Sequence, residues 1–219
     1  MRVLMMVVAC IACGAAPSLA QPSDRGYVNV GGGVAISSDT TSGNILGEVG
    51  VRVARNVFVF GDLGQFHNLQ PSLVQPTVDA TTLALASDGV TVNGTGRVPA
   101  LQLLGGVRYV IPTHGGVAPY LLGGAGMARL MPTAEFTYSS GTITGATPAP
   151  GDDVTSQLIS NGDFTTPPAA NAFMFTFGGG VRVPIAPHVD VDVGYRVSRV
   201  NADTPVNAQS IMAGVGYRF

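Results

Sequence analysis

The chain has 219 residues, of which 46% are hydrophobic and only 11% are charged, with 30 glycines and a formal net charge of −2. A soluble domain usually carries about twice this charged fraction, and a chain so close to neutral gives no argument for binding nucleic acid. After the first 20 residues there is no apolar run of helix-spanning length. These features leave two classes of protein: a β-barrel embedded in a membrane, or an exported all-β domain with an unusually apolar surface.

Residues 1–20 have the features of a secretory signal peptide: Arg2 near the start, an apolar run, and small residues before position 20. We predict cleavage after Ala20, which leaves residues 21–219 as the mature domain. Cys10 and Cys13 both lie in the predicted signal peptide, so the mature chain would have no disulfide, zinc site or cysteine nucleophile. The alternative is a lipoprotein anchored at Cys10, although few apolar residues precede that cysteine.

Alternation of apolar with small or polar residues predicts the first strands at residues 26–37, 45–53, 57–67 and 98–110, with a polar loop at 38–44. In the third strand Asp62 must face away from lipid. A charge on the lipid face near mid-membrane costs roughly 2–4 kcal/mol for Arg or Lys, and somewhat less for Asp. This register places Phe58, Phe60 and Phe66 inside the barrel beside Asp62.

The same alternation predicts the remaining strands at residues 117–130, 171–183, 189–200 and 208–219. The segment 189–200 alternates most clearly, with Val and Tyr on one face and charged or small residues on the other. In the segment 117–130 we place Arg129 inward, which makes Tyr120 and Leu122 lipid-facing.

Two long connections interrupt the strands, at about residues 68–97 and 132–170. We expect a small hairpin at 77–92 within the first, and a mobile segment in the second, whose Thr, Pro, Gly and Asp content cannot bury a core. The loops are acidic and opposed only by Arg97; the carboxylates are Asp39, Asp79, Asp88, Glu135, Asp152, Asp153, Asp163 and Asp203. These carboxylates form either a solvated surface of mutually repelling charges or a surface that contacts a host, matrix or neighbouring cell through divalent cations.

A Gly-Val-Arg phrase occurs at residues 50–52, 106–108 and 180–182, and a related Gly-Tyr-Arg at 216–218. Each internal copy precedes a short turn, so we interpret the four phrases as strands arriving at one rim with the arginine inward. Four such strands with their partners make an eight-stranded antiparallel up-and-down transmembrane β-barrel. Connections at this rim are about three to six residues, whereas three of the four at the other rim look longer, as in outer-membrane barrels.

The predicted inward-facing charges form one set: Glu48, Arg52, Asp62, Arg108, Arg182, Asp190, Asp192, Arg196 and Arg218. An eight-stranded barrel is just wide enough for side chains to fill it, so these residues are expected to be a structural network of ion pairs. The alternative is a narrow pore lined by the same charges. The rim arginines, including Arg52 and Arg108, could also meet anionic lipid headgroups.

The sequence offers little for catalysis or for a cofactor. His67, His114 and His188 are the only histidines, and no serine is placed convincingly to form a triad with them. His188 and Asp190 are two residues apart in one strand and would share a face. The glycine clusters sit in strands rather than in a phosphate-binding loop, so no cofactor, metal or nucleotide site is predicted.

The last strand alternates up to the final residue, with Ile211, Ala213, Val215, Tyr217 and Phe219 on one face. With the signal peptide and the repeated phrase, this Gly-Tyr-Arg-Phe end resembles the small outer-membrane β-barrel family of the OmpA, OmpX and opacity-protein type. The absence of tryptophan departs from that pattern. The resemblance implies a Gram-negative outer-membrane location and recognition of those five residues by the barrel-assembly machinery. It also implies outer-membrane lipids and lipopolysaccharide as partners.

From these features we expect a non-enzymatic integral outer-membrane protein with a structural or surface-interaction role, whose long loops bind an unspecified surface ligand. One alternative is a narrow, porin-like channel for small solutes. Another is a lipid-modifying outer-membrane enzyme, because enzymes of that kind exist among such barrels.

Overall fold

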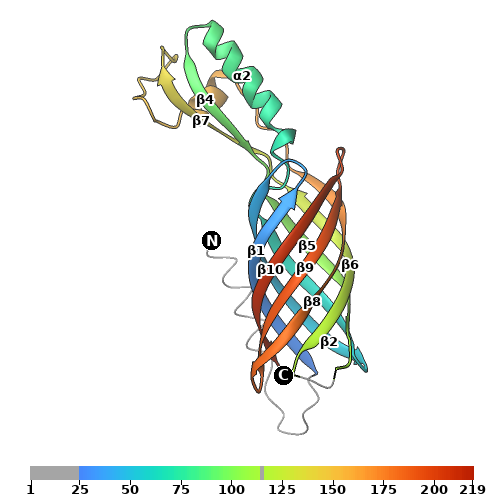
Figure 1. Ribbon diagram of the computed structural model, residues 1–219. Coiled ribbons are helices and arrows are strands. Elements are labelled where there is room, and N and C mark those ends of the chain that lie inside the picture. The colour runs from blue at the N-terminus through green and yellow to red at the C-terminus, as the bar shows by residue number, and fades with distance from the viewer. Residues whose placement is uncertain (1–24, 114–115) are drawn as a thin grey trace.

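The computed structural model describes residues 25–113 and 116–219, so the predicted signal peptide and His114 lie outside the described residues. The strands of the barrel are β1 (Gly26–Ser37), β2 (Thr41–Ala54), β3 (Val57–Phe66), β5 (Ala100–Val110), β6 (Ala118–Leu130), β8 (Ala170–Ala186), β9 (Val189–Asn201) and β10 (Val206–Arg218). They form a closed antiparallel barrel in the order β1-β10-β9-β8-β6-β5-β3-β2 (Figure 1). The predicted eight-stranded up-and-down barrel is therefore confirmed.

The barrel closes through the pairing of β1 with β10, from Tyr27 opposite Arg218 to Ser37 opposite Ala208. Closure leaves neither strand with a free edge, which a membrane requires because lipid offers no hydrogen bonds to the backbone. Side chains alternate between an exposed apolar outer face and a buried inner face in every strand. In β3 the buried residues are Phe58, Phe60, Asp62 and their period-2 partners, as predicted.

The predicted register of β6 is wrong. Tyr120 and Leu122 are buried in the lumen, and Arg129 is exposed on the outer face. Arg129 lies one residue from the end of its strand, opposite Asn171 of β8. An arginine at that height can extend into the polar headgroup layer, so its charge does not force the strand to turn it inward.

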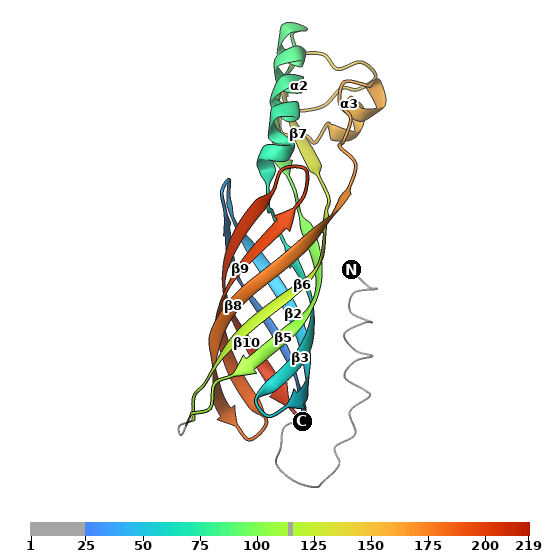
Figure 2. The same ribbon diagram turned by 90° about the vertical axis from the view of Figure 1, so that its right-hand side faces the viewer.

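The two rims of the barrel differ in their connections. At one rim, called here the turn end, residues 55–56, 111–117 and 187–188 make short connections. At the other rim only two of the four connections are long, not three, because residues 38–40 and 202–205 are short links and β2 already begins at Thr41. The two long connections, residues 67–99 and 131–169, together form a separate unit above the barrel that is called the head (Figure 2).

The head is built on a two-stranded ribbon, β4 (Thr91–Arg97) paired with β7 (Thr133–Ser140). The ribbon continues the β5–β6 ladder: Ala100 faces Leu130, and Arg97 faces Thr133 in the same register. Between these pairs the amide of Met131 donates to the carbonyl of Pro99 at 2.9 Å. One hairpin of the barrel wall thus extends beyond the rim as a two-stranded ribbon.

Helices pack on this ribbon, and both expectations for the long connections are wrong. Residues 77–92 do not form a hairpin: the 3₁₀ turn η1 (Pro71–Leu73) leads into α2 (Gln75–Ser87) and then β4. The second connection is not structureless, since it contains β7 and α3 (Thr155–Asn161). None of the helices in the described part of the chain is long and apolar enough to cross a membrane.

A single hydrophobic core joins the head to the barrel. Its head residues include Val78, Phe136 and Leu158, and its barrel residues include Leu130 and Met174 in the lumen near the head. α2 approaches β4 closely, because a Cβ atom on Gly94 would lie 2.3 Å from Val78. The apolar residues of the long connections therefore close the lumen of the barrel at the head end.

Replacing Phe136 tests this core. Its side chain is fully buried, with its ring centroid 5.0 Å from that of Phe164. We expect Phe136→Ala to lower the free energy of unfolding of the head by about 3–5 kcal/mol. Limited proteolysis should then cut residues 67–99 and 131–169 faster while the barrel persists. Leu83→Ala on α2, where Leu83 is 72% exposed, is the control, and equal digestion of the two variants would contradict a packed head.

Candidate functional site

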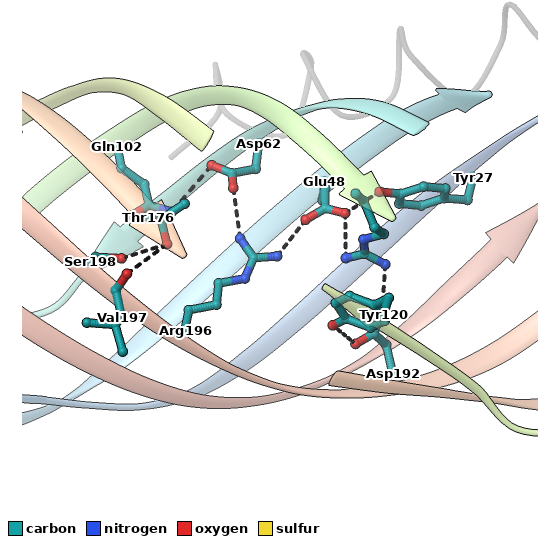
Figure 3. Close-up of polar contacts among 11 residues, drawn as sticks. Tyr27, Glu48, Asp62, Gln102, Tyr120, Thr176, Asp192, Arg196, Val197 and Ser198 are labelled. Carbon is teal, nitrogen blue, oxygen red and sulfur yellow. Dashed lines mark hydrogen bonds and ion pairs between the residues drawn. The ribbon is translucent and has the colours of Figure 1, made fainter. Parts of the chain in front are cut away.

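Buried polar side chains fill the middle of the lumen and form a cluster called here the plug. Its members are Tyr27, Glu48, Asp62, Arg108, Tyr120, Asp192 and Arg196 (Figure 3). They come from β1, β2, β3, β5, β6 and β9, so the plug connects strands all around the barrel. Three carboxylates face two guanidinium groups, which leaves the plug with one surplus negative charge.

Glu48 is the centre of the plug. One carboxylate oxygen, Oε1, accepts a hydrogen bond from the Tyr27 hydroxyl at 2.5 Å and lies 2.6 Å from Arg108 Nη2. The other, Oε2, lies 2.5 Å from Arg196 Nη2, and Nη1 of the same guanidinium lies 2.8 Å from Asp62. Burying a carboxylate is tolerable only when it is paired in this way. Glu48 thus holds two arginines and a tyrosine from three other strands.

Arg108 forms the second branch and is fully buried. Its Nη1 lies 3.1 Å from Asp192, whose other oxygen accepts a hydrogen bond from the Tyr120 hydroxyl at 2.6 Å. The guanidinium is also 3.9 Å from the Tyr120 ring centroid and 4.9 Å from that of Tyr27. Cation–π contacts of this kind strengthen where water is excluded. The two tyrosines therefore both bond the carboxylates and cover the arginine.

Glycines in neighbouring strands make room for these tyrosines. A Cβ atom on Gly50 would lie 2.3 Å from the Tyr27 ring, and one on Gly180 or Gly194 would lie 2.6 or 2.8 Å from the Tyr120 hydroxyl. The glycines thus have a packing role in this small lumen.

The remaining predicted lumen charges form a second cluster at the turn end. Asp190 is buried, and its Oδ2 lies 2.8 Å from Arg218 Nε and 3.6 Å from Arg182 Nε. These residues and Arg52 line a cavity of about 250 Å³, called here the vestibule. Arg52 is exposed, with its guanidinium 5.3 Å from the Phe58 ring centroid. The single predicted set of charges is therefore two clusters.

The tyrosines of the plug were not among the predicted lumen residues. Tyr27 shares its strand face with Asn29 and Gly31, opposite Val28 and Val30, so strand parity alone could have placed it inward. Tyr120 was missed because Arg129 was used to set the register of its strand. Gln102, which donates from Nε2 to Asp62 at 3.4 Å, could also have been found by parity.

The described histidines lie at opposite ends of the barrel. His67 follows β3 at the head end and is exposed, and His188 is exposed in the turn between β8 and β9. The His188 ring centroid lies 5.8 Å from that of Tyr217 on the outer face, whereas Asp190 is buried in the vestibule, so they do not share a face. Within residues 25–113 and 116–219, no group of three or more His, Cys, Asp or Glu could hold a metal ion.

The head carries most of the acidic surface predicted for the loops: six of the eight predicted carboxylates belong to it, Asp39 and Asp203 lie in the short links, and all eight are exposed. Asp153 precedes α3 and accepts hydrogen bonds from the amide of Thr155 at 2.9 Å and from its hydroxyl at 2.6 Å. These bonds hold the pKa of Asp153 below its usual value. Asp153 therefore stays ionised as part of the negative surface of the head.

The outer face of the barrel has two charged residues within its described strands, Arg129 and Arg199, and both lie near the head end. Neighbouring outward side chains there are amides, including Asn201, whose Oδ1 accepts a hydrogen bond from Arg199 Nε at 3.2 Å. The five predicted assembly residues point outward from β10 or follow its end, and Phe219 pairs with the start of β1 through Gly26.

Residues 6–219 match the family model described as outer membrane protein β-barrel domain. No curated protein matches the sequence significantly. Among solved structures, Neisserial surface protein A (NspA) is similar, with a TM-score of 0.49 and 16% identity over 91% of this chain and 100% of that one. Ail of Yersinia pestis has a TM-score of 0.45 and 16% identity, covering 89% and 99% of the two chains. The N-terminal barrel of Pseudomonas aeruginosa OprF has a TM-score of 0.44 and 14% identity, covering 91% and 100%.

Removing the centre of the plug should destabilise the barrel. Glu48→Leu leaves two buried arginines short of a partner, and we expect the free energy of unfolding to fall by about 3–5 kcal/mol. Urea unfolding of the refolded protein, followed by the gel shift between boiled and unboiled samples, measures this. Glu135→Leu, at an exposed position of the head, is the control. An unchanged urea midpoint for Glu48→Leu would contradict the proposed centre.

A methyl group at Gly50 should have a smaller effect in the same direction. Gly50→Ala places a Cβ atom against the Tyr27 ring, and we expect a loss of about 1–3 kcal/mol from overpacking. Gly47→Ala in the same strand is the matched control, because its Cβ would meet only the Leu63 carbonyl oxygen, at 3.9 Å. Equal urea midpoints for the two variants would show that Gly50 does not make room for the tyrosine.

Proposed function

Because the chain belongs to the outer membrane protein β-barrel domain family, we propose that it is a non-enzymatic anchor that displays its head at the bacterial surface. The barrel is an integral protein of a bacterial outer membrane, and family membership does not specify more, since one fold supports many functions. The observation that carries the proposal is the single core running from the lumen into the head. That core fixes the head to the barrel as a rigid projection.

The orientation follows from the two rims. Outer-membrane barrels place short turns in the periplasm and long loops outside. The head would then face the exterior and the turn end the periplasm, after export by the predicted signal peptide. The head presents exposed carboxylates on α2, on β7 and in its connecting segments, with Arg97 as the opposing charge, which suits a surface contact with a partner that carries positive charge or bound cations.

The filled lumen favours an anchor over a channel. The plug occupies its middle with ion pairs, and the hydrophobic core occupies its head end. A small-solute channel remains the second candidate, because the lumen is charged and the vestibule opens at the turn end. A lipid-modifying enzyme has less support, since His67 and His188 lie at opposite ends of the barrel.

Lipids and the assembly machinery are the other proposed partners. Arg129 and Arg199 sit on the outer face at the height expected for headgroups of the outer leaflet, where guanidinium groups pair well with the phosphates of lipopolysaccharide. The outward residues of β10 with Phe219 form the segment that we propose the barrel-assembly machinery recognises, as the resemblance implies.

Replacing the head tests the display function. In this variant short turns replace residues 68–97 and 132–169, and the heat-dependent gel shift checks that the barrel still assembles. We expect cells that display the variant to lose attachment to matrix-coated surfaces or to neighbouring cells. In planar bilayers the wild-type protein should give no discrete conductance, because the plug and the core both fill the lumen.

The other outcomes separate the alternatives. If cells that display the variant without the head attach as before, and the wild-type protein gives discrete conductance in planar bilayers, the channel would be favoured. A change in the mass of lipid A that depends on His67 or His188 would favour the enzyme. Asp203→Asn, which removes one charge from the same rim outside the head, controls for a general effect of surface charge on attachment.

A further inference from the structure

The vestibule is lined by more positive than negative charge. Its described lining residues include three arginines, Arg52, Arg182 and Arg218, but one carboxylate, that of Asp190. A single oxygen of Asp190 lies near both Arg182 and Arg218, at 3.6 and 2.8 Å. Since arginine stays protonated in proteins, the described lining side chains include two more positive charges than negative ones.

The plug does not cancel this surplus. Its three carboxylates and two arginines contribute one negative charge, so the described lumen as a whole keeps one positive charge more than it has negative. Arg182 is the link between the clusters, with its guanidinium 4.5 Å from the Tyr27 ring centroid. Several guanidinium groups around one open cavity attract an anion, and the lining of the vestibule presents three of them.

The shape of the vestibule also limits what it can bind. Its volume of about 250 Å³ is smaller than the pockets that hold drug-sized ligands, which start at roughly 300 Å³. Phe58 lines the vestibule, and its ring meets that of the plug residue Tyr27 edge to face at 5.5 Å. The cavity is therefore a blind pocket that opens toward the turn end.

We propose that the vestibule is a binding site for a phosphate group, held by Arg52, Arg182 and Arg218. Guanidinium groups match phosphate oxygens with two parallel hydrogen bonds, and Phe58 offers an apolar wall for a small group attached to the phosphate. The site is distinct from the head and acts from the opposite side of the membrane. The phosphate belongs either to a small soluble ester or to the headgroup of a phospholipid beside the turns.

The test compares two arginines of the same rim. Arg52 lines the vestibule, whereas Arg55 is exposed in the adjacent turn and is not among its lining residues. Inorganic phosphate is titrated into the refolded full-length protein in an uncharged detergent, and binding is measured by calorimetry. We expect saturable binding by the wild type, about tenfold weaker binding by Arg52→Gln, and little change for Arg55→Gln. The gel shift on boiling verifies that each variant is folded.

The two sources are separated in nanodiscs. If a phospholipid headgroup fills the vestibule, inorganic phosphate will bind more weakly in phosphatidylcholine nanodiscs than in the uncharged detergent. Equal affinity in nanodiscs and in detergent assigns the site to a soluble phosphate. Absence of saturable binding, or equal weakening by Arg52→Gln and Arg55→Gln, overturns the proposal. Neither result depends on what the head binds.

Discussion

A buried charge inside this barrel needs a partner, because the wall around it is embedded in lipid. Glu48 meets this constraint with contacts to Arg108, Arg196 and Tyr27. The other features of the lumen follow from it. The tyrosines need space, so glycines lie against them. Asp62 and Asp192 give Arg196 and Arg108, respectively, a second ion-pair partner.

The sequence was sufficient for the barrel and insufficient for the head. Strict alternation through Asp62 in β3 and Asp192 in β9 gave both the strands and their inner faces, because a mid-strand charge has one tolerable side. The same reasoning failed for β6, where Arg129 lies near the strand end and extends outward. The head escaped prediction because β4 pairs with β7, which lies about 40 residues further along the chain. No local pattern indicates such a pairing.

The candidate site was predictable in composition but not in arrangement. The repeated Gly-x-Arg phrase led us to group Arg52 with Arg108, and in the wall they are indeed at one level, on either side of Phe58. Their side chains diverge: Arg108 turns toward Glu48 and is fully buried, whereas Arg52 stays at the exposed mouth over the Phe58 ring. Register fixes the height of a residue, and the rotamer, which depends on distant strands, decides which cluster it joins.

The uninterrupted register between the β5–β6 ladder and the β4–β7 ribbon has a mechanical consequence. A force that pulls on the tip of the head is transmitted along the strand axes into the barrel wall. It therefore loads many backbone hydrogen bonds at once in shear rather than opening them one after another. A flexible loop would instead absorb the pull by extending. Under the proposed function, this geometry makes the head a stiff connection between the barrel and the surface that the head contacts.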